Sequence, residues 1–317
     1  MHVYLDLNVF DRAEKLDRLE VPERAYYDKL VRLIQDKKVR TAYSNAHLND
    51  LFRGYQKNPG YTSGHLNHIK KLTGELCICQ YWGNAKATWH YRDIFQFFQE
   101  KQQEWDDGPA DFDDFVKEYI DLSPEVSLIY EMYRRIPLPG NFKDGYSDPL
   151  FGVMFPLSKN QPNYYALQAD IYNFQCRLKS DFGLYKSFRS KLLNGLNKLK
   201  NNKEFLKVIN KDAPDLPKHL EIQTIFDIYT PENKTSENVL YDRVLDAYFK
   251  FDLSGYKSDG HYNNMFDDGL HTFYAAHFDC FITNDDRCKY KAEKTYERLK
   301  LKTRVIKIDQ IDEICNL

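Results

Sequence analysis

The N-terminal part of the chain alternates between short apolar runs and segments with helical spacing. Residues 3–7 are apolar and β-prone, and they predict a buried strand that ends near Asp6. Pro22 stands at a favoured first-turn position of a helix, and residues 38–43 indicate a second strand. Ser44 suits the N-cap of the helix that follows. The apolar positions of the two helices are Tyr26, Leu30, Leu33 and Ile34, then Leu48, Leu51 and Phe52.

The C-terminal part repeats this alternation. Residues 267–277 have the apolar spacing of a helix, and residues 279–283 have the character of a short strand. A charged helix over residues 289–301 and a last strand over residues 303–308 follow. Strands that alternate with helices predict an α/β fold, in which helices flank a parallel sheet.

The long middle of the chain differs in character. Strand signals are few there, helical spacing recurs, and proline and glycine cluster in residues 136–163, which indicates a loop between two helical halves. We therefore predict an α/β core of residues 1–54 and 264–317, interrupted by a mostly helical insertion over residues 55–263. The positions with helical spacing include Ile94, Phe97 and Phe98, then Leu240, Val244, Leu245 and Tyr248.

The composition is that of a globular protein and excludes a polycation. Hydrophobic residues make up 42% of the 317 positions, charged residues make up 29%, and the formal net charge is -2. Binding to nucleic acid would therefore need a local basic face or a metal ion that offsets the protein's own carboxylates. The 24 Tyr and 21 Phe are expected mainly in the core rather than as platforms for stacking bases.

The sequence predicts neither a membrane span nor an export signal. No run of about 18 apolar residues is present, and the N-terminal apolar run is broken by Asp6 and lacks a basic leader. The cysteines are scattered and form no pair of CxxC motifs, which fits reduced thiols and a cytoplasmic location. They are Cys77, Cys79, Cys176, Cys280, Cys288 and Cys315.

Carboxylates stand where the predicted strands end. Asp6 closes the first strand and Asp285 follows a later one, so both should face the crevice beyond the carboxyl ends of a parallel sheet. Asp50 lies in the helix after the second strand, and Asp267 and Asp268 begin a later helix. Each aspartate taken alone could be a helix cap or a turn residue. Four of these carboxylates in one crevice would repel one another unless a cation held them, and oxygen ligands suit Mg²⁺ or Mn²⁺.

The segments around these aspartates resemble PIN-domain nucleases. Residues 3–9 (VYLDLNV) look like the opening of that family, in which an aspartate closes the first strand and a small polar residue follows two positions later. Residues 44–51 (SNAHLNDL) are similar to its second acidic segment. Residues 268–285 resemble its C-terminal half, in which an acidic residue opens a helix and a later strand ends in Thr-x-Asp. The resemblance covers residues 1–54 and 264–312.

This resemblance implies a PIN-like (Rossmann-like) core and a metal-dependent nuclease. The ligands of Mg²⁺ or Mn²⁺, which would also be the catalytic residues, are implied to be Asp6, Asp50, Asp268 and Asp285. Asn8 and Thr283 would orient ligands or water by hydrogen bonding. One or two metal ions would bind the scissile phosphate, lower the pKa of a water molecule and stabilise the developing charge. The preference for RNA over DNA follows from the resemblance alone.

Three features depart from the family. The second acidic position is usually Glu, and Asp50 is one methylene shorter. Two aspartates are doubled, so Asp267 and Asp286 are alternatives to Asp268 and Asp285 as ligands. The long insertion has no counterpart in a compact family domain. It could clamp the substrate, cover the site, bind a protein regulator or form a homo-oligomer.

Several histidines lie near the acidic segments. His47 is expected to be packed or solvated, and His271 either touches the site or caps its helix. His65 and His68 have near-helical spacing for metal binding but no evident carboxylate partner, so a surface position is expected.

Basic residues concentrate in residues 186–211 and 287–307. Either stretch could follow a phosphate backbone, although a charge-rich helix is more often a solvated face. Arg287 and Lys289 follow Asp285 closely and could reach a substrate phosphate.

Three functions are compatible with these features. The first is a metal-dependent endonuclease that favours RNA. The second is a catalytically inactive PIN-like module that binds nucleic acid or protein, which the shorter Asp50 would favour. The third is a phosphohydrolase of small esters, but the usual Asp-x-Asp nucleophile and phosphate-cradling glycine loop are missing.

Overall fold

The computed structural model describes residues 1–81, 86–106, 111–200, 202, 239–255 and 257–316. These residues are mostly helical and contain short strands in two small sheets. Within them, no helix combines the length and the apolar character that crossing a lipid bilayer requires. The chain divides into two compact units, the first made of Met1–Gln103, Leu196–Asp259 and Asn263–Leu317, the second of Glu104–Gly195 and Gly260–Tyr262.

The first unit contains all the described strands and the helices at both ends of the chain. Its strands are β1 (Val3–Leu5), β2 (Tyr43–Ser44), β3 (Leu76–Cys79), β4 (Thr88–Tyr91), β5 (Cys280–Ile282) and β6 (Arg304–Ile306). Its α-helices are α1 (Leu7–Glu14), α2 (Val21–Gln35), α3 (Asn45–Lys57), α4 (Thr62–Thr73), most of α5 (Ile94–Asp106), α14 (Val239–Leu253), α15 (Tyr262–Ala275) and α16 (Asp286–Leu299). Short 3₁₀ segments are η1 (Leu16–Arg18), η2 (Pro59–Tyr61) and η4 (Ile308–Asn316).

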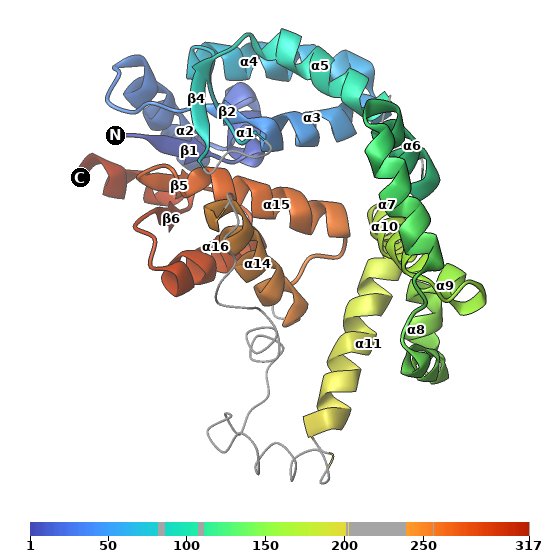
Figure 1. Cartoon of the computed structure of the whole chain (residues 1–317). Coiled ribbons are helices and arrows are strands. Elements are labelled where there is room, and N and C mark those ends of the chain that lie inside the picture. Colours follow the sequence, from blue (N-terminus) through green and yellow to red (C-terminus); the bar gives the residue numbers. More distant parts are fainter. Residues whose placement is uncertain (82–85, 107–110, 201, 203–238, 256, 317) are drawn as a thin grey trace. The chain divides into compact units, whose positions relative to one another are not determined.

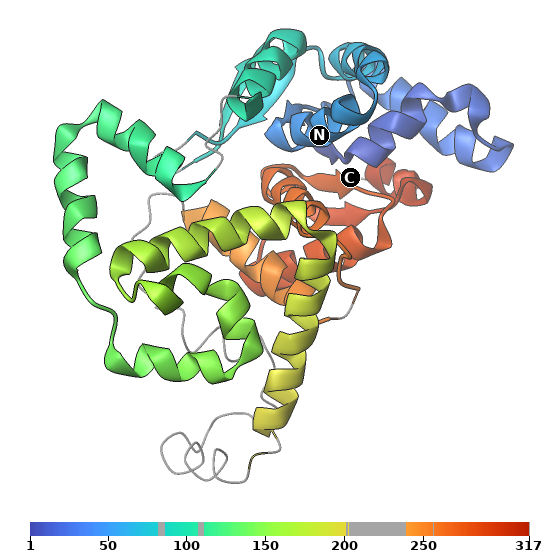
Figure 2. The same ribbon diagram turned by 90° about the vertical axis from the view of Figure 1, so that its right-hand side faces the viewer.

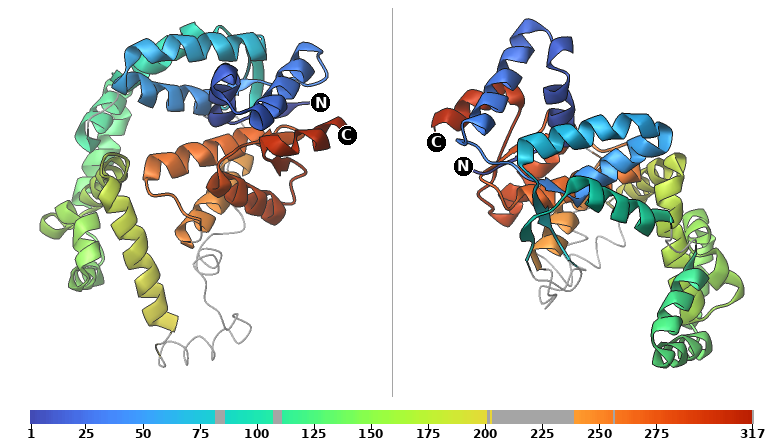
Figure 3. Two further views of the ribbon diagram at one scale, coloured as in Figure 1. Left: turned by 180° about the vertical axis from the view of Figure 1, so that it is seen from behind. Right: turned by 90° about the horizontal axis from the view of Figure 1, so that it is seen from above.

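Parallel pairing joins the two ends of the chain. β5 lies between β1 and β6, with Val3 opposite Cys280 and Cys280 opposite Arg304. β2 pairs with β3 in parallel, and β4 runs antiparallel to β3. A parallel bridge between His2 and Arg40 connects the two sheets. The N-terminal and C-terminal segments of the first unit therefore lie side by side in one sheet, and both views of Figure 3 show the two chain ends close together.

Successive side chains of the strands enter two different cores, one on each face of the sheets. Val3 and Leu5 pack with side chains of α1, α2, α3 and α4, whereas Tyr4 and Phe281 pack with side chains of α14, α15 and α16. Figure 1 shows these two sets of helices on opposite sides of β1 and β5. Burial on both faces explains why β1 is apolar at every position, as expected of a parallel sheet flanked by helices.

The observed elements at the chain ends follow the predicted alternation, with shifted boundaries. The first strand stops at Leu5, because α1 begins directly after Asp6, and this helix was not predicted. The second strand is limited to Tyr43–Ser44, and Ser44 is the predicted N-cap of α3. Among the residues predicted to form a helical insertion, β3 and β4 are strands. The apolar run Cys77–Cys79 of β3 is fully buried, and neither of its two cysteines forms a disulfide.

The second unit is helical (Figure 2). It has an aromatic core of its own. Its α-helices are α6 (Phe112–Leu122), α7 (Pro124–Arg135), α8 (Pro149–Met154), α9 (Pro156–Asn160), α10 (Tyr164–Ser180) and most of α11 (Phe182–Lys200), with the 3₁₀ segment η3 (Gly140–Ser147). The predicted loop over residues 136–163 thus contains short helices, and a bridge from Pro137 to Asn163 closes it. Phe112 and Tyr165 lie at the centre of the core.

The first unit is larger than the predicted core of residues 1–54 and 264–317. Residue 54 lies inside α3, and the compact unit continues to Gln103. The reason is packing, because Leu66 and Cys77 complete one core, and Ile78 and Val244 complete the other. Removing all of residues 55–263 would therefore expose both faces of the sheets.

Candidate metal centre

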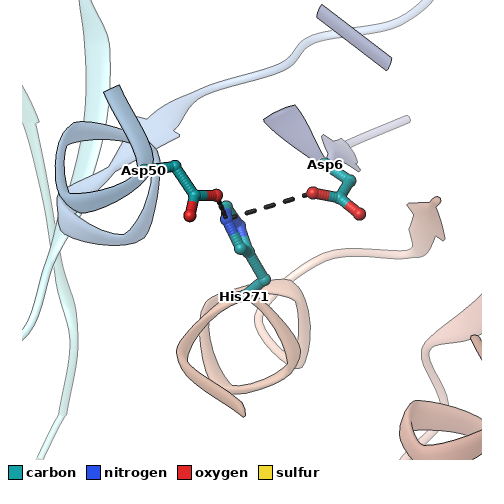
Figure 4. Close-up of side chains that lie close together, drawn as sticks. All are labelled: Asp6, Asp50 and His271. Carbon is teal, nitrogen blue, oxygen red and sulfur yellow. Dashed lines mark hydrogen bonds and ion pairs between the residues drawn. The ribbon is translucent and has the colours of Figure 1, made fainter. Parts of the chain in front are cut away.

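Asp6 lies between β1 and α1, at the carboxyl end of the parallel strands. Its backbone N–H donates a hydrogen bond of 3.0 Å to the Ile282 carbonyl of β5. Its Oδ2 accepts hydrogen bonds from Asn8 Nδ2 at 2.7 Å and from Thr283 Oγ1 at 2.6 Å. The other oxygen, Oδ1, faces His271 at 4.0 Å (Figure 4). The two hydrogen bonds therefore fix the carboxylate with one oxygen available to a ligand.

Asp50 and His271 converge with Asp6 on one point. Asp50 comes from α3 and His271 from α15, and His271 Nε2 lies 2.9 Å from Asp50 Oδ2. One ligand atom from each of the three side chains lies within 4.8 Å of the other two. Figure 4 shows the three side chains pointing toward one another from separate elements. Two carboxylates and one imidazole nitrogen are a donor set that can hold a divalent metal ion.

Asp6 and Asp50 line a hollow of about 470 Å³ in the first unit, and His271, which is not part of the lining, contacts both of them. Asp268 and Asp285, the other two predicted ligands, line the same hollow. Asp285 is also the N-cap of α16 and accepts backbone hydrogen bonds from Arg287 at 2.6 Å and Cys288 at 3.0 Å. The structure thus brings four predicted carboxylates to one hollow, with three-way convergence at Asp6, Asp50 and a histidine.

The two alternative aspartates point elsewhere. Asp267 forms an ion pair with Arg53 at 2.7 Å, and Asp286 forms one with Lys307 at 2.5 Å. Neither aspartate lines the hollow. Burial, with the neighbouring charge of Asp50, raises the pKa of Asp267 to about 7.

Asp50 accepts a hydrogen bond on each of its oxygens. Arg53 donates to Oδ1 and His271 Nε2 lies against Oδ2. Burial by itself would raise the pKa of Asp50, but the hydrogen bond from His271 and the charge of Arg53 hold it below its usual value. Burial would lower the pKa of His271, yet Asp50 and Asp6 raise it, so the imidazolium is the favoured form beside these carboxylates.

A divalent cation fits this set of donors. Burial raises the pKa of Asp6, and burial with the charges of Asp259 and Asp6 raises that of Asp268, so the fold would gain from a positive charge here. His271 can be a ligand through Nε2 only as the neutral imidazole, so a metal ion would displace its proton. The expected oxygen-only set thus becomes a mixed set of two carboxylates and one imidazole nitrogen.

A buried chain of hydrogen bonds behind His271 sets its orientation. Ser44 N–H donates to His47 Nδ1 at 3.0 Å, so His47 carries its hydrogen on Nε2 and donates it to the Leu5 carbonyl at 2.7 Å. Ser44 Oγ lies 3.1 Å from the same Nδ1 and 2.7 Å from Tyr4 OH. In a consistent chain, Ser44 donates to His47, Tyr4 donates to Ser44, and His271 Nδ1–H donates to Tyr4 at 2.9 Å. Nε2 of His271 is then directed at the carboxylates.

Tyr4→Phe removes the acceptor for His271 Nδ1–H. We expect affinity for Mn²⁺ to fall about 10–100-fold, because the imidazole loses the partner that orients it. We also expect the free energy of unfolding to fall by about 1–3 kcal/mol, since a buried donor is left unsatisfied. Calorimetric titration and urea denaturation measure the two effects.

Tyr248→Phe is the matched control for this variant. The Tyr248 hydroxyl is buried and has no hydrogen-bond partner among the described residues, so its removal should change neither quantity. Equal losses in the two variants would contradict the orienting role of Tyr4.

The buried imidazole of His47 is expected to make the folded state less stable in acid. Burial, aided by the charge of His271, lowers the pKa of its imidazole from 6.5 to about 3. The unfolded chain binds this proton first, so the folded state loses stability as the pH falls from about 6.5 toward 3, at up to about 1.4 kcal/mol per pH unit. We expect urea denaturation of His47→Gln to show a flatter pH dependence than the wild type. Parallel curves for the two proteins would refute this assignment.

Other sequence-based interpretations change with the structure. His47 is packed, as expected, whereas the predicted surface position of His65 is wrong, because it is buried beside Asp11 and Glu14. These carboxylates belong to α1, a helix that was not predicted. His271 contacts the candidate site rather than only its own helix.

The basic stretch over residues 287–307 is largely neutralised by nearby acids. Lys289, Lys294 and Lys307 form ion pairs within the stretch or with its flanking residues. Arg287 is the member of this stretch that lines the hollow. In the other stretch, over residues 186–211, positions 201 and 203–211 lie outside the described residues.

No protein-family model, curated protein or solved structure matches this chain. The class that the structure itself defines is a mostly helical α/β protein with a small parallel sheet. Its distinguishing feature is an acidic hollow lined by Asp6 and Asp50, which together with His271 could hold a metal ion.

Proposed function

We propose that this protein is a divalent-metal-dependent endonuclease that hydrolyses phosphodiester bonds, with RNA favoured over DNA. The observation that carries the proposal is the convergence of Asp6, Asp50 and His271 at the carboxyl end of parallel strands. The choice of phosphodiester chemistry and of RNA rests on the resemblance of the two chain ends to PIN-domain nucleases.

The residues around the hollow have separable roles in this proposal. Asp6, Asp50 and His271 would hold the ion, which when bound supplies Lewis acidity toward the phosphate and lowers the pKa of water. Asn8 and Thr283 keep Asp6 Oδ2 occupied, so that Oδ1 is presented to the site.

Two further side chains would act on water and substrate. Asp268 lines the hollow, and burial with the charges of Asp259 and Asp6 raises its pKa, which suits a group that takes a proton from the attacking water. Arg287 also lines the hollow, and its guanidinium could pair with a non-bridging phosphate oxygen.

A cleavage assay tests the proposal directly. Labelled RNA and DNA are incubated with the protein in Mn²⁺, in Mg²⁺ or in EDTA. We expect cleavage with Mn²⁺, more of it on RNA than on DNA, and none in EDTA. Cleavage that persists in EDTA would overturn the metal-dependent mechanism, and stronger cleavage of DNA would overturn the preference for RNA.

One observation favours a second candidate, a module that binds nucleic acid or protein without cleaving it. Both oxygens of Asp50 already contact cationic side chains, Arg53 and His271, so the chain itself can neutralise this carboxylate. Binding of labelled RNA without cleavage in any metal would support this module over the nuclease.

A further inference from the structure

A second set of metal-ligand atoms is formed by residues outside the candidate centre, two of which line the same hollow. Asp11 and Glu14 lie three positions apart on α1, and His65 lies on α4. His65 Nδ1 is 2.5 Å from Glu14 Oε2, and His65 Nε2 is 3.7 Å from Asp11 Oδ1. One ligand atom from each side chain lies within 4.8 Å of the other two.

The neighbours of Glu14 allow its carboxylate to lie close to His65. Its Oε2 is shielded from solvent and makes no contact with hydrogen-bond geometry, although His65 Nδ1 is near. A Cβ atom at position 64 would come within 3.1 Å of Glu14 Oε1, so Gly64 leaves space for the carboxylate against α4. A cation coordinated by Glu14 Oε2 and by His65 would give this shielded oxygen a partner of opposite charge.

Solvent reaches this group of side chains from two sides. Asp11 and His65 line the hollow of the candidate centre. Glu14, His65 and Lys15 line a separate hollow of about 290 Å³. An ion could therefore enter without unfolding either helix.

We propose that Asp11, Glu14 and His65 form a second divalent-metal site, selective for Zn²⁺-like ions. A mixed set of one imidazole nitrogen and two carboxylates suits Zn²⁺ or Co²⁺ better than Mg²⁺, which prefers oxygen ligands alone. The proposal does not depend on nuclease activity, because its ligands differ from those of Asp6, Asp50 and His271.

Lys15 is the cation that competes for this site. Lys15 is the C-cap of α1, and its ammonium forms an ion pair with Asp11 Oδ1, four residues earlier. A metal ion at Asp11 would have to displace that ammonium. Lys15→Met therefore removes a competitor and should strengthen metal binding, whereas a purely structural cluster of charges would gain no affinity for a metal.

The test is a titration with Zn²⁺ by calorimetry and with Co²⁺ by visible absorption, on the full chain. We expect the wild type to bind ions at two separable sites. His65→Gln should lose one of them with at least about a hundredfold fall in affinity, and Asp6→Asn should lose the other. Lys15→Met should bind Zn²⁺ several times more tightly than the wild type.

His68→Gln is the matched control, since His68 lies on the same helix and outside the ligand group. It should titrate as the wild type does. If His65→Gln titrates like His68→Gln, the second site is wrong. Should His65→Gln fail to fold by circular dichroism, Glu14→Gln replaces it with the same expected loss. Two sites remaining in Asp6→Asn would count against the candidate centre alone, because the Zn²⁺ site has its own ligands.

Discussion

Asp6→Asn is expected to lower metal-dependent cleavage by on the order of 10³-fold. The amide keeps the size of the side chain but loses the negative charge that faces His271. Because burial raises the pKa of Asp6, the fold already disfavours its charge, and the neutral amide should not lower the free energy of unfolding at neutral pH. The variant therefore separates activity from stability, and both are measured on the same preparation by a cleavage assay and urea denaturation.

Asp286→Asn is the control for this change. Asp286 directly follows Asp285, is exposed and pairs with Lys307 away from the hollow. We expect it to cleave RNA at the rate of the wild type. If Asp6→Asn retains that rate, or if both variants lose it equally, the candidate centre is not the catalytic site.

Lys291→Met is expected to destabilise the protein by about 3–5 kcal/mol. The Lys291 ammonium is fully buried between two carboxylates, at 2.9 Å from Asp252 Oδ1 and in contact with Asp259 Oδ2. Burial would lower the pKa of Lys291, but Asp252 and Asp259 raise it above its usual value, so it remains charged. Its removal leaves two buried carboxylates without a counter-charge. Thermal and urea denaturation measure the loss.

The pH dependence of this loss identifies its cause. Carboxylates without a cation bind protons more readily, so the difference between Lys291→Met and the wild type should shrink as the pH falls toward 5. Lys294→Met, on the same helix, removes only an exposed ion pair with Glu297 and should remain close to the wild type. A loss of stability that does not vary with pH would mean that packing, rather than charge, explains the effect.

Lys291 also connects stability to the site. Asp259 and Asp285 both line the hollow, and Lys291 holds the segment of Asp259 against α16, which Asp285 caps. Loss of this ion pair should therefore disturb the wall of the hollow that carries Asp285. Lys291→Met therefore tests whether the ion pairs of Lys291 contribute both to the stability of the fold and to the shape of the hollow.

The α/β alternation at the chain ends could be predicted because it is a local property. A strand buried on both faces must be apolar throughout, and an amphipathic helix must repeat its apolar positions every three or four residues. Residues 3–5 satisfy the first demand and α3, which Ser44 caps, satisfies the second, in each case without reference to the rest of the chain. The strands β3 and β4 were missed, because these short runs are recognisable as strands only from their pairing, β3 with β2 and β4 with β3.

Asp6 and Asp285 could be predicted to line one hollow for the same reason, because parallel strands end at the same edge. The choice between neighbours could not be made in this way. Asp267 and Asp268 differ by about 100° around a helix, so the packing of α15 decides that Asp268 faces the hollow and Asp267 faces Arg53. Arg53 stands three residues after Asp50 on α3, and this spacing was the signal in the sequence for their ion pair.

By itself the sequence determined which segments are buried and where carboxylates follow strands. Both depend on the spacing of apolar residues and on the order of neighbouring residues, which are local properties of the chain. Only the tertiary structure decided that an imidazole joins the carboxylates, since His271 reaches Asp6 and Asp50 from a distant helix. It likewise buried Lys291 between two aspartates and set His65 beside the carboxylates of α1. Contacts between distant segments leave no spacing in the sequence, because the fold and not the chain brings their atoms within bonding distance.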